Sequence, residues 1–131
     1  MNDEHGQAIV EFALVLPVLL VVTLAIALVA DLGIARLALQ HATAEAARVG
    51  ALTNDDDAIR AMLVASVAPL PPEEIGSAIA PPASEPPRNS DPRGSLLTVR
   101  ASYAVPIPLG FVGVSRIVVT SSATRRVEWS P

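Results

Sequence analysis

The chain has 131 residues, of which 51% are hydrophobic, and this length fits one small domain. It contains no cysteine, which excludes disulfides, thiol catalysis and cysteine-based metal sites. The formal net charge is -4, every basic residue is an arginine, and only Arg125 and Arg126 are adjacent. A nucleic-acid partner is therefore not expected.

An apolar run dominates the N-terminal part of the chain. From Phe12 to Ala30 there are 19 consecutive residues without a charge. As a helix that rises about 1.5 Å per residue, this run spans roughly 28 Å, close to the ~30 Å hydrocarbon core of a bilayer. We therefore expect a single transmembrane helix over residues 7–30.

Glu11 is the one charge at the edge of this run. A carboxylate costs least at the membrane interface, so Glu11 either marks the point of entry or has a functional role. Residues 1–6 are too short to form an element of their own and are interpreted as a leader peptide. A secretory signal peptide cut between Ala25 and Ala30 is the alternative. The missing basic n-region, and an apolar run beyond the usual ~7–15 residues, count against it.

The string that runs from Gly6 to Pro17, Gly-Gln-Ala-Ile-Val-Glu-Phe-Ala-Leu-Val-Leu-Pro, has a specific pattern. A glycine followed by four residues and then Glu-Phe resembles the class III signal of type IVb pilins and pseudopilins. The whole string is similar to the start of the TadE-like family of minor pseudopilins. The resemblance implies that a prepilin peptidase cuts between Gly6 and Gln7. It also implies that Glu11, followed by Phe12, registers the subunit by pairing with the new amine of Gln7 on a neighbouring subunit.

We expect the helix to continue beyond the membrane over residues 31–52. Apolar residues follow one another there at alternating spacings of four and three, a repeat typical of a helix that packs along a partner. This seam consists of Leu28, Leu32, Ala35, Leu39, Ala42, Ala46 and Val49. Its partner is either the protein's own head or a neighbouring subunit. The end of this helix, Ala-Ala-Arg-Val-Gly-Ala, again resembles the TadE-like family.

A second, shorter helix is expected at the start of a small head that covers residues 53–131. Thr53-Asn54 followed by the acids Asp55, Asp56 and Asp57 predicts an N-cap and an acidic first turn for a helix over residues 55–67. Binding of a divalent cation by these three acids is the less favoured alternative, because adjacent side chains on a helix diverge. Gly50 is expected to cap or bend the first helix.

The rest of the head is expected to be a proline-rich loop followed by a small sheet. Residues 69–94 hold eight of the twelve prolines, and residues 75–80 can form a short strand within this loop. From residue 95 the apolar period is two, which predicts a half-buried strand that contains Leu97 to Val105 and a second strand over residues 116–129. We expect these two strands to pair antiparallel and to pack on the long helix. The fold class is therefore α+β, and the resemblance to the TadE-like family implies a pilin-like fold.

The apolar connection between these strands, residues 106–113, is expected to form the end of the core. A docking site is the alternative for this connection.

The distribution of histidines argues against an enzyme. His5 lies in the leader and His41 lies among alanines, without a turn that would present a nucleophile. The chain has no glycine-rich phosphate loop and no metal-ligand motif, so no cofactor and no metal is expected.

The resemblance implies a minor pseudopilin that takes part in the assembly of a Tad (Flp-type) pilus or secretion apparatus. The implied partners are other pilin subunits, the assembly platform, the prepilin peptidase and membrane lipid. The alternative is a single-pass, membrane-anchored binding or adhesion module that is neither processed nor assembled.

The orientation in the membrane rests on the resemblance. No basic residue precedes the helix, whereas Arg36 and Arg48 follow the apolar run. The positive-inside rule alone would therefore place the N-terminus outside. The pilin-like resemblance implies the opposite arrangement, a single-pass protein of the bacterial inner membrane with its head outside the cytoplasm, available for incorporation into an extracellular pilus.

Overall fold

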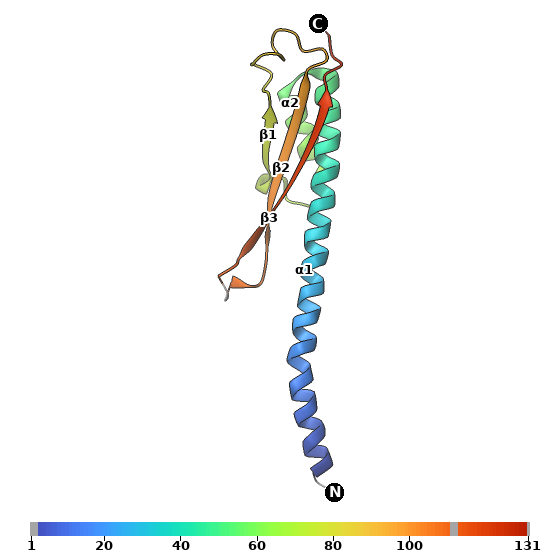
Figure 1. The fold of residues 1–131 in the computed structure, drawn as a ribbon, viewed down its shortest axis with the longest axis vertical. Helices are drawn as coiled ribbons and strands as arrows, with labels where there is room; N and C mark the ends of the chain where they lie inside the picture. The colour runs from blue at the N-terminus through green and yellow to red at the C-terminus, as the bar shows by residue number, and fades with distance from the viewer. Residues whose placement is uncertain (1–2, 111–112, 131) are drawn as a thin grey trace. The chain divides into compact units, whose positions relative to one another are not determined.

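A computed structural model describes residues 3–110 and 113–130, with side chains from Gly6 onward. Within these residues the elements in chain order are α1 (Asp3–Thr53), α2 (Asp56–Ser66), the 3₁₀ turn η1 (Pro72–Glu74), β1 (Gly76–Ala80), β2 (Leu96–Pro106) and β3 (Arg116–Arg126) (Figure 1). The chain divides into two compact units, Met1–Leu32 and Gly33–Pro131. The expected α+β class is confirmed.

The first unit is the N-terminal part of α1. Pro17 lies inside the helix without ending it. The Thr23 hydroxyl donates to the Leu19 carbonyl at 2.8 Å, which satisfies the hydroxyl within an otherwise apolar segment. Most of the large apolar side chains of this unit are exposed, and none of its described residues is fully buried.

The core of the second unit lies where α1 packs against the sheet and α2. Leu39, Ala42 and Ala46 of α1 are fully buried. Alanine side chains let the helix backbone approach the sheet closely, and the larger residues of the sheet and α2 fill the remaining space. The buried cluster consists of Leu39, Ala42, Ala46, Ala47, Ile59, Leu63, Val67, Leu97, Val99, Ala101 and Val127.

The sheet is antiparallel throughout, with the strand order β1-β2-β3. Val99 of β2 lies opposite Ile79 of β1 and Ala123 of β3. Along β2 the residues Leu97, Val99 and Ala101 are buried and their neighbours are more exposed, which is the predicted period of two. The two predicted long strands and their antiparallel pairing are confirmed.

β3 ends three residues before the predicted end. The strand stops at Arg126, and the chain then turns toward the end of α1. The backbone N–H groups of Glu128 and Trp129 donate to the Ala51 carbonyl at 2.7 and 3.1 Å. The apolar pattern of the strand cannot reveal this end, because it does not show that the following backbone N–H groups donate to a carbonyl of α1 and not to β2.

The expectation that Gly50 caps or bends the first helix is wrong. The helix continues to Thr53, and Asn54 then adopts the left-handed conformation (φ 52°) and donates its N–H to the Gly50 carbonyl at 2.9 Å. Asparagine tolerates this conformation better than most residues. Gly50 instead allows close packing, because an added Cβ would lie 2.5 Å from Leu97 Cδ2 and 2.6 Å from Ile59 Cδ1 unless these side chains shifted.

The second helix and the short strand lie within a residue of their predicted bounds. The Asp55 carboxylate caps α2 by accepting the Asp57 N–H at 2.9 Å, and Ile59 and Leu63 form the buried face of this helix. β1 begins at Gly76. Apart from η1 and β1, the proline-rich segment (residues 69–94) has no helix or strand.

Candidate functional site

The predicted cleavage point, Gly6 and Gln7, lies in the helical part of the first unit, and both residues are exposed. Nothing lies within 4 Å of the position that a Cβ on Gly6 would occupy. The rest of the leader cannot be described in full, because Met1 and Asn2 lie outside the described residues. Gly6 and Gln7 are therefore accessible within their own chain.

Glu11 and Phe12, the predicted registration residues, are also exposed. Glu11 follows Gln7 by four residues, which places both on one face of the helix, one turn apart. Among the described residues Glu11 takes part in no ion pair. A carboxylate next to an apolar run favours a positively charged partner wherever water is scarce, so the position suits a contact with another chain.

The apolar run itself is long and hydrophobic enough to cross a membrane. An 18-residue stretch of this helix has a mean hydropathy of 3.0, and none of its residues is buried within the described part of the chain. Exposed leucine, valine and isoleucine on every side of a helix are typical of a segment whose partner is lipid or another helix. This finding fits a single-pass membrane anchor.

The seven residues of the predicted seam fall into two groups. Leu28 and Leu32 belong to the first unit and are half-buried, whereas the other five lie in the second unit. Leu39, Ala42 and Ala46 belong to the buried cluster of the head. The structure therefore places these three residues against the protein's own sheet and α2.

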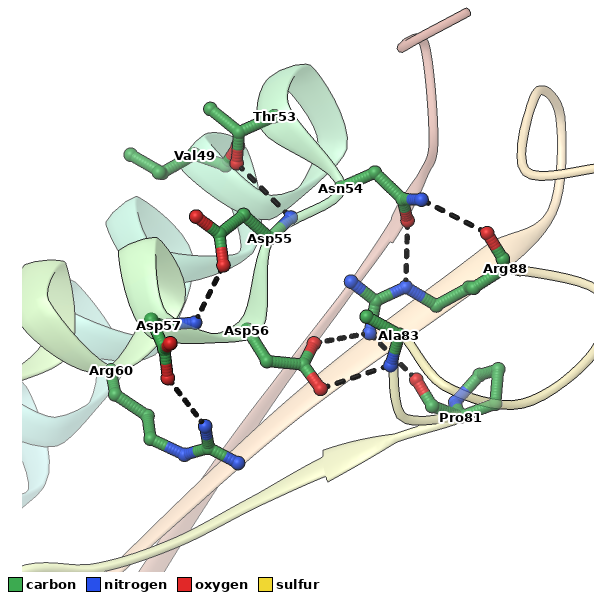
Figure 2. Close-up of polar contacts among 10 residues, drawn as sticks. All are labelled: Val49, Thr53, Asn54, Asp55, Asp56, Asp57, Arg60, Pro81, Ala83 and Arg88. Carbon is green, nitrogen blue, oxygen red and sulfur yellow. Dashed lines mark hydrogen bonds and ion pairs between the residues drawn. The ribbon is translucent and has the colours of Figure 1, made fainter. Parts of the chain in front are cut away.

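The second unit contains one charged cluster that the sequence reasoning missed, centred on Arg88 in the proline-rich segment (Figure 2). The Arg88 side chain is fully buried. Its Nε donates to Asn54 Oδ1 at 2.9 Å, and its Nη1 donates to Asp56 Oδ1 at 2.6 Å and to the Pro81 carbonyl at 2.8 Å. The cluster ties this segment to the start of α2.

Two further hydrogen bonds belong to the Arg88 cluster. Asn54 Nδ2 donates to the Arg88 carbonyl at 3.0 Å, and Asp56 Oδ2 accepts the Ala83 N–H at 2.9 Å. A buried charge is tolerated only when it is paired and hydrogen-bonded, and four of these contacts come from residues distant in sequence. A lone arginine among prolines gave no signal of this role in the sequence.

The three consecutive acids of α2 have separate partners. Asp55 caps the helix, Asp56 pairs with Arg88, and Asp57 pairs with Arg60 at 3.1 Å (Figure 2). The residues that the structure describes contain no group of three or more histidine and acidic side chains placed to hold a metal. The capping prediction is confirmed for Asp55. His41 is exposed on α1.

The N-terminal part of the chain was compared with known protein families. A family model described as TadE-like protein matches residues 6–48. Over this segment the chain is similar to the TadE-like family. The matched region begins at the glycine of the predicted cleavage point and ends within the part of α1 that packs on the head. No curated protein and no solved structure matches the chain. The TadE-like segment implies a role related to the Tad pilus.

Proposed function

We propose that this protein is a minor pseudopilin that takes part in the assembly of a Tad (Flp-type) pilus or secretion apparatus. The observation that carries the proposal is the position of the TadE-like match, which starts at Gly6 and covers the whole apolar run. In this proposal a prepilin peptidase removes residues 1–6 and leaves Gln7 with a free amine. The residues that follow then act as the assembly element.

The exposure of the first unit supports an assembly role. Phe12 is 64% exposed, and Ile9, Val10 and Leu14 are exposed to a similar degree. Burying apolar surface contributes roughly 25 cal/mol per Å², so such a helix is stable only in lipid or against other helices. The same segment can therefore serve as a membrane anchor before assembly and as a packing surface within a filament.

The proposed mechanism assigns registration to Glu11. After cleavage, the Gln7 amine of one subunit pairs with the Glu11 carboxylate of its neighbour. The pairing offsets the desolvation of both charges, and it fixes the axial offset between subunits because an unpaired buried charge is costly. The part of the seam within the first unit, Leu28 and Leu32, would lie along the neighbouring subunit.

The proposal also covers location and partners. The protein would cross the bacterial inner membrane once, with its head outside the cytoplasm, and would contact other pilin subunits and the assembly platform. Incorporation into the extracellular pilus is part of the same proposal. One long apolar helix and the TadE-like match support this location.

The first test is the N-terminal residue of the protein, measured by mass spectrometry on material from its native membrane. A chain that begins at Gln7 supports processing by a prepilin peptidase. An intact leader would instead make the protein a membrane-anchored binding or adhesion module. Cleavage between Ala25 and Ala30 would indicate a secreted head and would remove any role for Glu11.

The second test addresses registration. Glu11→Leu and Glu11→Ala should leave membrane insertion unchanged and reduce pilus assembly, whereas Glu11→Asp should retain part of it. Glu73→Leu is the matched control, because Glu73 is an exposed acid of the head and should be neutral. Normal piliation by both Glu11→Leu and Glu11→Ala would exclude the pairing.

A further inference from the structure

The strand β3 forms one edge of the sheet, on the side away from β1 (Figure 1). Two backbone hydrogen bonds show which of its groups face β2. Beyond one end of the pairing the Val127 N–H donates to the Ser95 carbonyl at 2.8 Å, and beyond the other the Ile107 N–H donates to the Ser115 carbonyl at 2.9 Å. Hydrogen-bonded residues alternate along an antiparallel ladder. The odd-numbered residues of β3 therefore bond to β2, and the even-numbered residues direct their N–H and C=O groups outward.

The outward backbone groups of β3 have no partner within the described part of the chain. In the middle of the strand they belong to Val118, Thr120, Ser122 and Thr124, whose side chains are also exposed. The side-chain hydrogen bonds of this stretch link hydroxyls only, Thr43 with Ser121 and Thr98 with Thr124. An edge of this kind is a template for pairing with another extended segment.

The composition of β3 does not protect this edge. Residues 117–124 contain no charged residue, no proline and no glycine, and five of the eight are β-branched. Proteins usually protect an edge with a charge, a proline or a very short strand. The other edge of the sheet follows that rule, since β1 has only five residues and lies between Pro71-Pro72 and Pro81-Pro82. The difference between the two edges favours a contact at β3.

A groove lies at the C-terminal end of the same edge. It has a volume of about 590 Å³, and side chains from α1 and from the end of β3 line it. Successive side chains of a strand point to opposite faces, yet both Arg125 and Arg126 line the groove. The groove therefore reaches both faces of the strand and includes its edge. The charged residues of the lining are Glu45, Arg48, Arg125, Arg126 and Glu128.

Positive charge is in excess in this groove, because three arginines and two glutamates line it. Arg48 and Glu45 are 3.9 Å apart and partly exposed, which makes a weak ion pair. Arg125 takes part in no ion pair among the described residues. At the other end of the strand Arg116 is exposed as well. Guanidinium groups bind carboxylates through two parallel hydrogen bonds, so both ends of the edge suit an acidic partner.

We propose that β3 is the docking edge for an extended, acidic segment of another protein, which adds to the sheet as a further strand. About six to eight residues of this segment pair with the outward groups of β3. Carboxylates at its ends bind Arg116 on one side and Arg125 with Arg126 on the other. The backbone hydrogen bonds supply affinity for any extended segment, and the arginines select for charge. This inference goes beyond the proposed pilus role and does not depend on cleavage after Gly6 or on Glu11.

The charges of β3 disfavour a second copy of the same chain as the partner. When two copies of the strand pair antiparallel over its full length, Arg116 of each copy lies opposite Arg126 of the other. Like charges directly opposite each other are destabilising, and this register has them at both ends. A different chain with acidic ends avoids this repulsion.

The first measurement is backbone amide exchange of the full-length chain in detergent, followed by NMR. In the free, monomeric protein the N–H groups of Thr120 and Ser122 should exchange freely. Those of Val119 and Ser121 should be protected, because they bond to β2. Protection of Thr120 and Ser122 in the free protein would show that the edge is already covered, and it would overturn the proposal.

The second measurement uses random peptides of about ten residues, displayed on phage and selected on the immobilised full-length protein. We expect the selected peptides to carry Asp or Glu at their ends and β-branched residues between them. Synthetic copies of these peptides should slow amide exchange at Thr120 and Ser122 roughly tenfold or more. A selection that yields no peptide with this effect would overturn the proposal.

A proline substitution tests the backbone contact. Ser122→Pro removes one outward N–H and should weaken binding of the selected peptides roughly tenfold, which corresponds to the loss of one or two hydrogen bonds. Ser77→Pro is the matched control, because Ser77 lies on β1 and also directs its N–H away from β2. Unfolding followed by Trp129 fluorescence verifies that both variants fold. Equal peptide affinity of the two folded variants would contradict pairing at β3.

A charge reversal tests the same edge without altering the backbone. Arg125→Glu with Arg126→Glu should weaken binding of the acidic peptides roughly tenfold or more. Arg60→Glu with Arg93→Glu makes the same change of charge at exposed positions outside the groove and should have a small effect. Equal effects of the two double variants would exclude the arginines as the acidic contact.

Self-association of the chain would also decide against the proposal. If the full-length protein forms dimers in detergent and Ser122→Pro abolishes them, a second copy occupies the edge. None of these measurements bears on the N-terminal residue of the mature chain, so a failure of the proposed processing is seen separately.

Discussion

Two consecutive stretches of α1 differ in the exposure of their apolar side chains. In residues 12–30 the large apolar side chains lie on all sides and nearly all of them are exposed, whereas residues 33–53 bury one face against the sheet and α2. The backbone geometry is the same in both, so side-chain size and pattern make the difference. Leucine and valine all round a helix favour lipid or other helices, and a stripe rich in alanine favours close packing on a sheet.

The exposure of leucine side chains also differs within a single turn of the second stretch. Leu37 is 68% exposed and Leu39, two positions later, is 0% exposed. Neighbouring leucines of one helix therefore contribute very differently to the stability of the head. The following substitutions test the contrast between the two stretches, beginning with the largest expected effect.

Charges placed in the first stretch should prevent its insertion into a membrane. Val21→Arg combined with Val22→Arg should cost about 6–8 kcal/mol of insertion free energy, because each arginine near the centre of a span is unfavourable. The fraction of protein that resists carbonate extraction from membranes measures the effect. Leu52→Arg with Val64→Arg, two exposed positions of the head, is the control and should extract like the parent protein. Equal extraction of the two double variants would contradict the anchor.

Removing a buried leucine in the second stretch should destabilise the head. Leu39→Ala is expected to lower the free energy of unfolding by about 3 kcal/mol, through lost burial and the cavity left behind. Leu37→Ala should change it by less than about 0.5 kcal/mol. Trp129 packs against the core and is the only tryptophan, so its fluorescence during urea unfolding reports the effect. Similar unfolding midpoints for the two variants would contradict the packing of α1 on the sheet.

The Arg88 cluster predicts a smaller loss that is concentrated in the proline-rich segment. Arg88→Met should cost about 2 kcal/mol, because Asp56 and Asn54 lose their buried partner. Arg93→Met is the control, since Arg93 is exposed in the same segment. Limited proteolysis should cut residues 81–90 faster in Arg88→Met alone. If both variants are cut at the same rate, Arg88 does not hold the segment on α2.

Two glycines of α1 should respond to alanine with opposite signs. Gly50→Ala should destabilise the head by about 1 kcal/mol, because the new Cβ meets the buried side chains of Leu97 and Ile59. Gly33→Ala should stabilise α1 by about 0.5–1 kcal/mol, because a Cβ there meets nothing within 4 Å and alanine favours a helix. Both changes are measured by thermal unfolding of the full chain in detergent. The same sign for both would mean that helix propensity, and not packing, governs Gly50.

Local patterns in the sequence predicted most of the fold. The uncharged run predicted a spanning helix, the alternation around Leu97 and Val99 predicted the strands, and the acids before α2 predicted its cap. Each of these signals depends on the period of one element or on the chemistry of a few neighbouring residues. For the same reason the TadE-like resemblance could be recognised from a continuous string that begins at Gly6.

The candidate site stays a prediction, and the structure describes its surroundings. Gly6, Gln7, Glu11 and Phe12 were identified from the resemblance to the TadE-like family, and the structure adds that all four are exposed. The seam was identified as apolar, but periodicity cannot tell whether the protein's own sheet or another subunit covers it. Leu39, Ala42 and Ala46 lie against the sheet and α2. The sequence pattern of α1 could not show this, because the strands that cover these residues come much later in the chain.

By itself, the sequence predicted most elements of this protein, an apolar run long enough to cross a membrane and the TadE-like resemblance of the N-terminal segment, since these follow from residues close together along the chain. Only the tertiary structure decided the role of Gly50 and the burial of Arg88. Gly50 makes room for Leu97 and Ile59, and Arg88 pairs with Asp56 across 32 positions. Such contacts join residues far apart in sequence, and no local pattern encodes which distant side chains will share one space.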